Sequence, residues 1–89
     1  MTHTSQRELN KKIKKTRKRI EVGKKYRHFK NPKDLYVIEQ IGILENTEEV
    51  CVVYKALYGE GIVWIRTLEN FLSKKETKKG RVARFTKAG

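Results

Sequence analysis

The sequence predicts a small, mainly β fold of five short strands, preceded by a basic amphipathic helix. Two apolar, β-branched and aromatic runs, 50–58 and 62–66, flank the break Gly59-Glu60-Gly61, which is typical of a β-hairpin. Polar turn sequences separate further short apolar runs, and a lysine-rich segment at the N-terminus has helical spacing. A chain of 89 residues has room for one domain with a modest core.

The N-terminal helix is predicted by a capping pattern and a narrow apolar stripe. Ser5 and Glu8 stand at capping-box spacing, so a helix is expected over residues 6–20. The stripe falls within about 60° of the helix circumference at 100° per residue and consists of Leu9, Ile13, Thr16 and Ile20. We expect it to pack on the β domain or on a symmetry-related copy, the alternative being a solvated, fraying tail.

Five strands are expected after the helix, separated by turn sequences. They cover residues 24–30, 35–44, 50–58, 62–66 and 80–86. Asn31-Pro32-Lys33-Asp34 is a turn sequence, and Gly42 is a candidate bulge in the second strand. Both hairpin arms are apolar at nearly every position, so we expect the hairpin to lie centrally in its sheet with both faces covered.

A short helical turn is expected before the last strand. Leu68, Phe71 and Leu72 have the spacing of one helical turn that plugs a barrel end, and residues 73–79 are expected as a charged loop. Five strands with a helical turn before the fifth give the order of an SH3-like barrel or roll. The expected units are a basic helix or arm at 1–21, the β domain at 22–86 and a tail at 87–89.

The formal net charge of +12 is unevenly distributed along the chain. Residues 1–20 carry +7, residues 21–33 carry +4 and residues 73–89 carry +6, whereas residues 34–72 carry −5. Basic extensions on a compact module are typical of proteins that contact nucleic acid, an acidic protein or another anionic surface. The alternative is a tail that only increases solubility.

The single cysteine, Cys51, cannot form an internal disulfide, and no N-terminal apolar run resembles a signal peptide or membrane span. We therefore expect a cytoplasmic protein with no membrane partner. Cys51 lies in an apolar strand, where a thiol is protonated and inert, so a nucleophilic pair with His28 is not expected. His3, His28 and Cys51 lack metal-ligand spacing, and there is no phosphate-cradling glycine loop. We expect no cofactor, no metal and no enzymatic activity.

An ordered set of motifs runs through residues 22–86. The motifs are Gly23-x-x-Tyr26-x-His28-Phe29-Lys30, Tyr36-Val37, Asn46-Thr47-Glu48-Glu49, Val53-Tyr54-x-Ala56-Leu57-Tyr58-Gly59, Trp64-x-Arg66-x-Leu68-x-x-Phe71 and Arg84-Phe85. In these motifs the chain resembles the bacterial family catalogued as domain of unknown function 1653. The resemblance implies an SH3-like roll and no established activity, and it leaves the basic helix outside.

A candidate recognition face combines aromatic rings with cationic or hydrogen-bonding groups, and it consists of Tyr26, His28, Tyr54, Trp64 and Arg66. The resemblance points to the same residues and to Arg84. Trp64 and Arg66 share one side of their strand, as Tyr26 and His28 do on theirs, so together they can form a cluster that stacks a base or grips an anion. The alternative is that these rings pack in the core or at its rim.

The leading hypothesis is a non-enzymatic module that binds RNA or DNA through the cations of its basic flanks. The candidate phosphate contacts are Lys11, Lys12, Lys15, Arg19, Lys24, Lys30 and Arg84. The alternatives are a protein or peptide interaction module of SH3-like type and a binder of small anionic ligands. The chain is expected to be a monomer or a weak homodimer.

Overall fold

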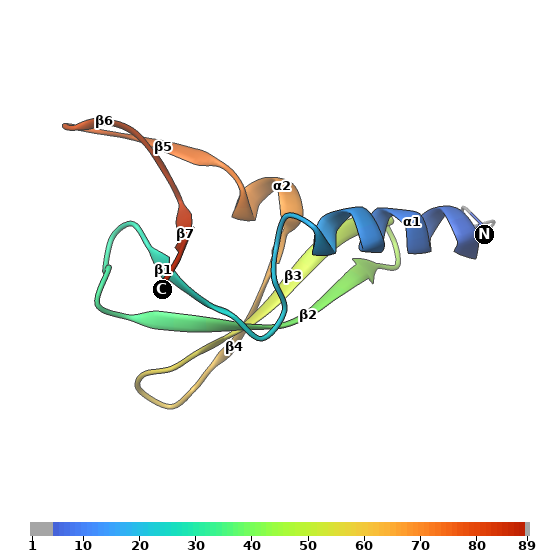
Figure 1. The fold of residues 1–89 in the computed structure, drawn as a ribbon, viewed down its shortest axis with the longest axis horizontal. Coiled ribbons are helices and arrows are strands. Elements are labelled where there is room, and N and C mark those ends of the chain that lie inside the picture. Colours follow the sequence, from blue (N-terminus) through green and yellow to red (C-terminus); the bar gives the residue numbers. More distant parts are fainter. Residues whose placement is uncertain (1–4, 89) are drawn as a thin grey trace.

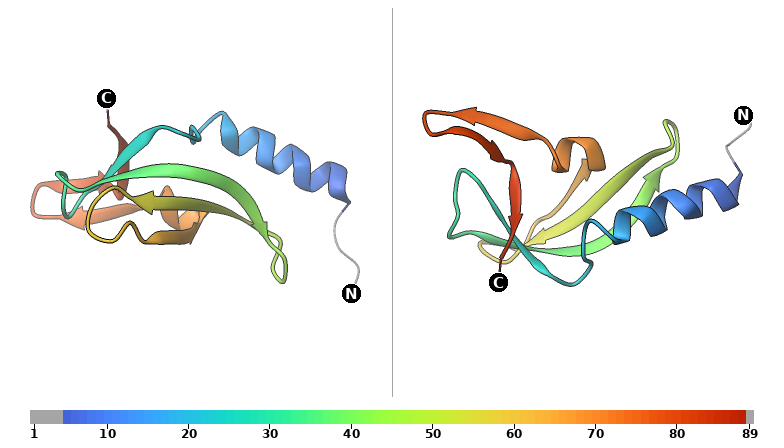
Figure 2. Two further views of the ribbon diagram at one scale, coloured as in Figure 1. Left: turned by 90° about the horizontal axis from the view of Figure 1, so that it is seen from below. Right: turned by 45° about the horizontal axis from the view of Figure 1, so that its top comes forward.

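The structure is a computed structural model that describes residues 5–88, and over this range it has two helices and seven strands. In chain order these are α1 (Gln6–Arg17), β1 (Lys25–His28), β2 (Leu35–Leu44), β3 (Glu49–Ala56), β4 (Val63–Thr67), α2 (Leu68–Phe71), β5 (Lys74–Thr77), β6 (Gly80–Ala83) and β7 (Phe85–Lys87). The main sheet is strongly curved, and the β5–β6 hairpin projects away from it (Figures 1 and 2). Neither helix is long and apolar enough to span a membrane.

Five strands form one antiparallel sheet in the order β4-β3-β2-β1-β7, and β5 pairs with β6 as a separate hairpin. The mainly β class and the two predicted helical segments are confirmed, but the expected count of five strands is wrong. Residues 73–79 contain β5 instead of being only a loop, and the strand expected over 80–86 is divided into β6 and β7. Within residues 5–88, β4 and β7 each have one partner, so the sheet is open and a closed barrel is not confirmed.

The last predicted strand is divided at Arg84 because the main chain leaves one sheet there and enters the other. The N–H of Arg84 donates to the carbonyl of Ser73 at 2.9 Å, and its carbonyl accepts the N–H of Phe29 at 3.0 Å. At the tip of the β5–β6 hairpin, Gly80 has φ of +107° and its carbonyl accepts the hydroxyl of Thr77 at 2.8 Å. A tight turn and main-chain pairing thus build a hairpin in a segment that lacks a strand-like apolar pattern.

A β-bulge in β2 decides which of its side chains face the core. The pairing with β3 shifts register between Ile38 and Gln40, whereas Gly42 pairs regularly with Cys51, so the bulge expected at Gly42 is wrong. Ile38 and Ile41 both lie in the buried cluster although they are three residues apart. In a regular strand such a pair points to opposite faces, and the extra residue of the bulge brings both to the same face.

β3 and β4 form the predicted hairpin, but only β3 is central. Gly59 and Gly61 have φ of +57° and +67°, the left-handed region that glycine enters at least cost. β3 pairs with both β2 and β4, and its Val52 is completely buried. β4 is an edge strand whose Val63 and Ile65 are 53% and 66% exposed, so the expectation that both arms are covered is wrong for β4.

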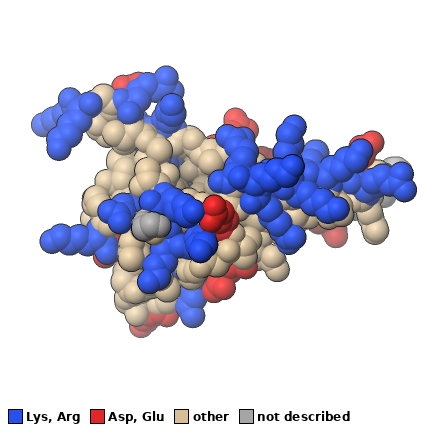
Figure 3. All heavy atoms as spheres, in the orientation of Figure 1, with Lys and Arg blue, Asp and Glu red and all other residues tan. Residues whose placement is uncertain are grey.

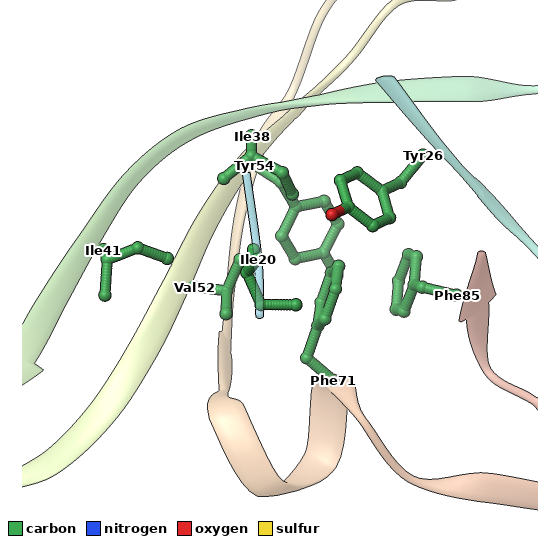
Figure 4. Close-up of a cluster of buried hydrophobic side chains, with 8 residues drawn as sticks. All are labelled: Ile20, Tyr26, Ile38, Ile41, Val52, Tyr54, Phe71 and Phe85. Atoms are coloured by element: carbon green, nitrogen blue, oxygen red, sulfur yellow. The ribbon is translucent and has the colours of Figure 1, made fainter. Parts of the chain in front are cut away.

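The core lies between α2 and one face of the sheet, which we call the inner face (Figure 4). Its buried side chains are Ile20, Tyr26, Ile38, Ile41, Val52, Tyr54, Phe71 and Phe85. Phe71 of α2 is 2% exposed and stacks on Phe85 with ring centroids 4.2 Å apart. The hydroxyl of Thr67 caps α2 by accepting a backbone N–H at 3.2 Å. The predicted helical turn is therefore confirmed, and it supplies the central ring of the core.

α1 begins at the predicted cap and packs on β2 and β3 through the predicted stripe. The side chain of Ser5 accepts a first-turn N–H at 3.3 Å. Thr16 and Ile20 are buried and Ile13 packs against the core, so a helix docked on its own chain is confirmed. The helix ends at Arg17 instead of residue 20, and a turn then carries Ile20 into the core. The domain boundaries expected at residues 21 and 86 remain predictions.

Candidate functional site

Strand register gathers aromatic and cationic side chains at one end of the inner face. Tyr54 pairs with Trp64 across β3 and β4, and His28 pairs with Phe85 across β1 and β7. Together with their neighbours they enclose a space of about 240 Å³, which we call the aromatic–arginine pocket. It is lined by His28, Lys30, Asn31, Tyr36, Tyr54, Trp64, Arg66 and Phe85.

The guanidinium of Arg66 is fixed in this pocket by uncharged partners. Its Nε donates to the hydroxyl of Tyr54 at 2.8 Å, and a terminal nitrogen donates to Oδ1 of Asn70. Its central carbon lies 5.5 Å from the centroid of the Phe85 ring, within cation–π range. Among residues 5–88 no carboxylate lies within ion-pair distance of Arg66, since the recorded pairs are Glu21 with Lys87 and Glu76 with Arg81. The pocket thus holds an oriented positive charge without a counter-charge.

His28 is uncharged near neutral pH and has a defined tautomer. Burial lowers the pKa of its imidazole, and the positive charges of Arg66, Arg84 and Lys30 lower it further. Its Nδ1 accepts the backbone N–H of Lys30 at 3.2 Å, so the proton of the neutral ring sits on Nε2. The ring meets Phe85 edge to face at 5.0 Å between centroids. His28 therefore offers one N–H donor in a positive environment.

Tyr36, Asn31 and Phe85 line the pocket but are not among the candidate site residues of the sequence. The hydroxyl of Tyr36 lies 2.6 Å from that of Tyr58, and burial together with this hydrogen bond raises the pKa of Tyr36. The alternation of β2 predicts Tyr36 on the face opposite Ile41, and the bulge after Ile38 removes that alternation. The signal for Tyr36 was its place in the motif Tyr36-Val37.

Several predicted site residues lie elsewhere. Tyr26 is buried in the core, where its hydroxyl accepts the N–H of Glu21 at 3.2 Å, so packing explains this ring. Arg84 donates from Nε to the hydroxyl of Ser73 at 2.9 Å and does not line the pocket. Lys11 and Lys24 are exposed, on α1 and before β1 respectively. The pocket brings together the other predicted members of the recognition face and Lys30.

A second cationic site lies along one flank of α1. Lys12 and Lys15 lie one turn apart on α1, and Arg19 lies in the turn after the helix. With Thr16 they face Val50 of β3 and Leu68 of α2 across a space of about 260 Å³. We call this the helix groove. Figure 3 shows Lys and Arg atoms covering the side of α1 that faces the viewer. Within residues 5–88 the three cations form no ion pair.

Cys51 has the environment of a structural cysteine. It is buried, burial raises the pKa of its thiol, and the thiol donates weakly to the carbonyl of Glu49 at 3.8 Å. In the part of the chain that the structure describes, no three His, Cys, Asp or Glu side chains gather in a group that could hold a metal ion.

Comparison with known proteins gives one family and one related structure. The family model described as "Protein of unknown function (DUF1653)" matches residues 24–87. The crystal structure of a DUF1653 protein from Bordetella bronchiseptica is 30% identical, with a TM-score of 0.65 over 75% of this chain and 86% of that chain. No curated protein matches the sequence. The aromatic–arginine pocket lies within the matched residues, whereas α1 lies outside them.

Proposed function

The chain belongs to the DUF1653 family, whose function is not established, and we propose that this member is a non-enzymatic module that binds nucleic acid. The observation that carries the proposal is the helix groove. There a docked helix and the turn after it hold Lys12, Lys15 and Arg19 along one groove without carboxylate partners among residues 5–88. Cations displayed in this way attract a polyanion and release its counterions.

The packing of α1 makes this charge a structured surface. Thr16 and Ile20 are buried, so the flank that bears the cations has a fixed orientation relative to the sheet. Lys12 and Lys15 lie one turn apart on α1, and Arg19 lies in the turn that follows the helix. The groove therefore suits several successive phosphates.

The aromatic–arginine pocket supports the same proposal from another part of the molecule. Trp64 is 48% exposed and lines the pocket together with Arg66 and Lys30. An accessible indole beside cations is the combination on which single-stranded nucleic acids stack their bases. We therefore favour single-stranded RNA or DNA over duplex as the ligand.

The proposal is tested by the salt dependence of binding to a short fluorescent single strand. The variant K12Q/K15Q/R19Q removes three cations from the groove, and K55Q/K74Q/K75Q removes three exposed lysines from β3 and β5 as the matched control. The slope of log K against log salt is negative, and it should become shallower by about 2 in the groove variant. Each lost phosphate contact on a single strand reduces its magnitude by about 0.7.

The outcomes separate a site from general charge. The control variant should lose less affinity and less slope than the groove variant. Equal losses in both variants would show that net charge alone attracts the strand. An absence of binding at low salt in the unsubstituted protein would disprove the proposal.

A second candidate function is the capture of an extended peptide by β4. This strand is paired on one side only within residues 5–88, and its outward Val63 and Ile65 are more than half exposed. An edge strand of this kind can accept another strand through main-chain hydrogen bonds. In a pull-down, I65K should then abolish partner capture while the groove variant K12Q/K15Q/R19Q retains it. The reverse result would favour nucleic acid.

A further inference from the structure

The side chain of Arg66 has hydrogen-bonding capacity that the protein does not use. A guanidinium has five N–H donors, and the structure assigns one to Tyr54 and one to Asn70. Both acceptors are uncharged, and the ring of Phe85 completes the support. Because these partners are uncharged, they orient the guanidinium without neutralising its positive charge. The remaining donors suit an oxyanion, because Arg binds planar and tetrahedral oxyanions through paired hydrogen bonds.

The other walls of the pocket favour an anion with more than one negative charge. Lys30 adds a second cation to the lining, and Arg84 adds positive potential that reaches His28. His28 adds an N–H donor on Nε2 because its Nδ1 is already an acceptor. A carboxylate or an internal phosphodiester carries one charge, whereas a phosphate monoester carries about −1.5 to −2 at pH 7. The monoester therefore gains most from this cluster.

The size of the pocket and its aromatic wall limit the rest of the ligand. Its volume of about 240 Å³ is below the range of about 300–1,000 Å³ that is usual for sites of drug-sized ligands. It can therefore take a phosphate and part of one nucleotide. Trp64 lines the pocket with an indole that is about half exposed, and an exposed ring face can stack a base.

We propose that the aromatic–arginine pocket binds the terminal phosphate monoester of a nucleotide, with the attached base against Trp64. The phosphate can belong to the end of a single strand or to a free mononucleotide, since both present the same chemistry. This proposal rests on the proposed function and deepens it, because it assigns end recognition to the pocket and leaves internal phosphates to the helix groove.

The test compares one short single strand in three forms: with a 5′-phosphate, with a 3′-phosphate and with hydroxyls at both ends. A free mononucleotide forms the fourth sample. We expect one phosphorylated form to bind the full-length chain about tenfold or more tightly than the hydroxyl form, the gain typical of a charge-assisted hydrogen bond. In NMR spectra, the bound monoester should also raise the pKa of His28, because it places negative charge beside the ring.

Four variants locate the effect. K30Q and W64A change pocket side chains for which the structure records no hydrogen bond, so each should reduce the preference for the phosphorylated end without unfolding the chain. K33Q removes an exposed lysine from the same turn, outside the pocket, and should leave the preference unchanged. K12Q/K15Q/R19Q should lower the affinity for all three strands equally and should retain the preference for the phosphorylated end.

Each outcome decides between the two proposals. Equal binding of all three strands, with no His28 shift from the mononucleotide, overturns end recognition and leaves nucleic-acid binding by the groove intact. Binding of the mononucleotide without binding of any strand supports the pocket and overturns the proposed function. A preference for the phosphorylated end that survives both K30Q and W64A would place the monoester elsewhere and overturn the assignment.

Discussion

The aromatic–arginine pocket and the helix groove both gather cations that have no carboxylate partner among residues 5–88, but they hold them in different ways. In the pocket, Arg66 is fixed by Tyr54, Asn70 and the ring of Phe85. In the groove, Lys12 and Lys15 project from an exposed helix flank. A fixed guanidinium can discriminate the geometry and charge of an anion, whereas flexible ammonium groups contribute affinity that depends mainly on salt. The pocket lies within the DUF1653 match and the cations of the groove lie outside it, so the two properties can vary independently.

The largest expected effect is on the pocket, from F71A. Phe71 is almost completely buried and stacks on Phe85, which forms a wall of the pocket. Truncation of Phe71 therefore leaves a cavity beneath the aromatic–arginine pocket. The free energy of unfolding should fall by about 3–5 kcal/mol, measured by urea denaturation. L72A removes a half-buried side chain from the adjacent position and should cost less. Equal costs would contradict the central role of the Phe71 stack.

The next effect is on the groove, from I20A. Ile20 is buried in the core after the end of α1, so its truncation loosens the docking of the helix. We expect a loss of about 2–5 kcal/mol in unfolding free energy. Amide exchange should accelerate within residues 6–17 more than in β3. Uniform acceleration over both segments would show that helix and sheet unfold as a single unit, and the groove could then not be weakened alone.

A smaller effect is expected from S5A, which removes the cap of α1. The Ser5 side chain accepts a first-turn N–H at 3.3 Å, and losing such a cap costs about 1 kcal/mol. In a domain of this size the midpoint of thermal unfolding should fall by about 4–8 °C. T67A removes the cap of α2 and is the matched control. In low salt, S5A should bind the single-stranded nucleic acid more weakly. T67A should instead change the preference of the pocket for the phosphorylated end.

The smallest expected effect is on the pH dependence of stability. It distinguishes the pocket from the groove because it depends on His28, which lines the pocket. In the folded protein the pKa of His28 lies below its ordinary value of 6.5, so the unfolded chain binds more protons between the two values. The contribution of His28 to stability is therefore complete above about pH 6.5 and is lost as the pH falls toward the folded pKa. H28Q should flatten the pH dependence of the unfolding midpoint in this window. An unchanged slope in H28Q would show that burial and the neighbouring positive charges do not lower the pKa of His28 in solution.

Local sequence signals predicted those features that depend on neighbouring residues. The Ser5 cap, the turn at Gly59 and Gly61, and the helical turn that buries Phe71 all occur as expected. Each depends on a few consecutive side chains and backbone angles, and so the sequence contains all the information required. The stripe on α1 likewise predicted which side of the helix is buried, because helical periodicity is a local property.

The sequence by itself thus determined the mainly β class and the basic amphipathic helix, and it offered His28, Trp64 and Arg66 as candidate neighbours. Only the tertiary structure decided the strand order, the edge position of β4 and the separate β5–β6 hairpin. It also decided the bulge after Ile38, which places Tyr36 in the pocket lining. These features depend on pairing between segments distant in the chain. A shift of one residue in such a pairing exchanges the two faces of a strand, and local periodicity carries no information about that shift.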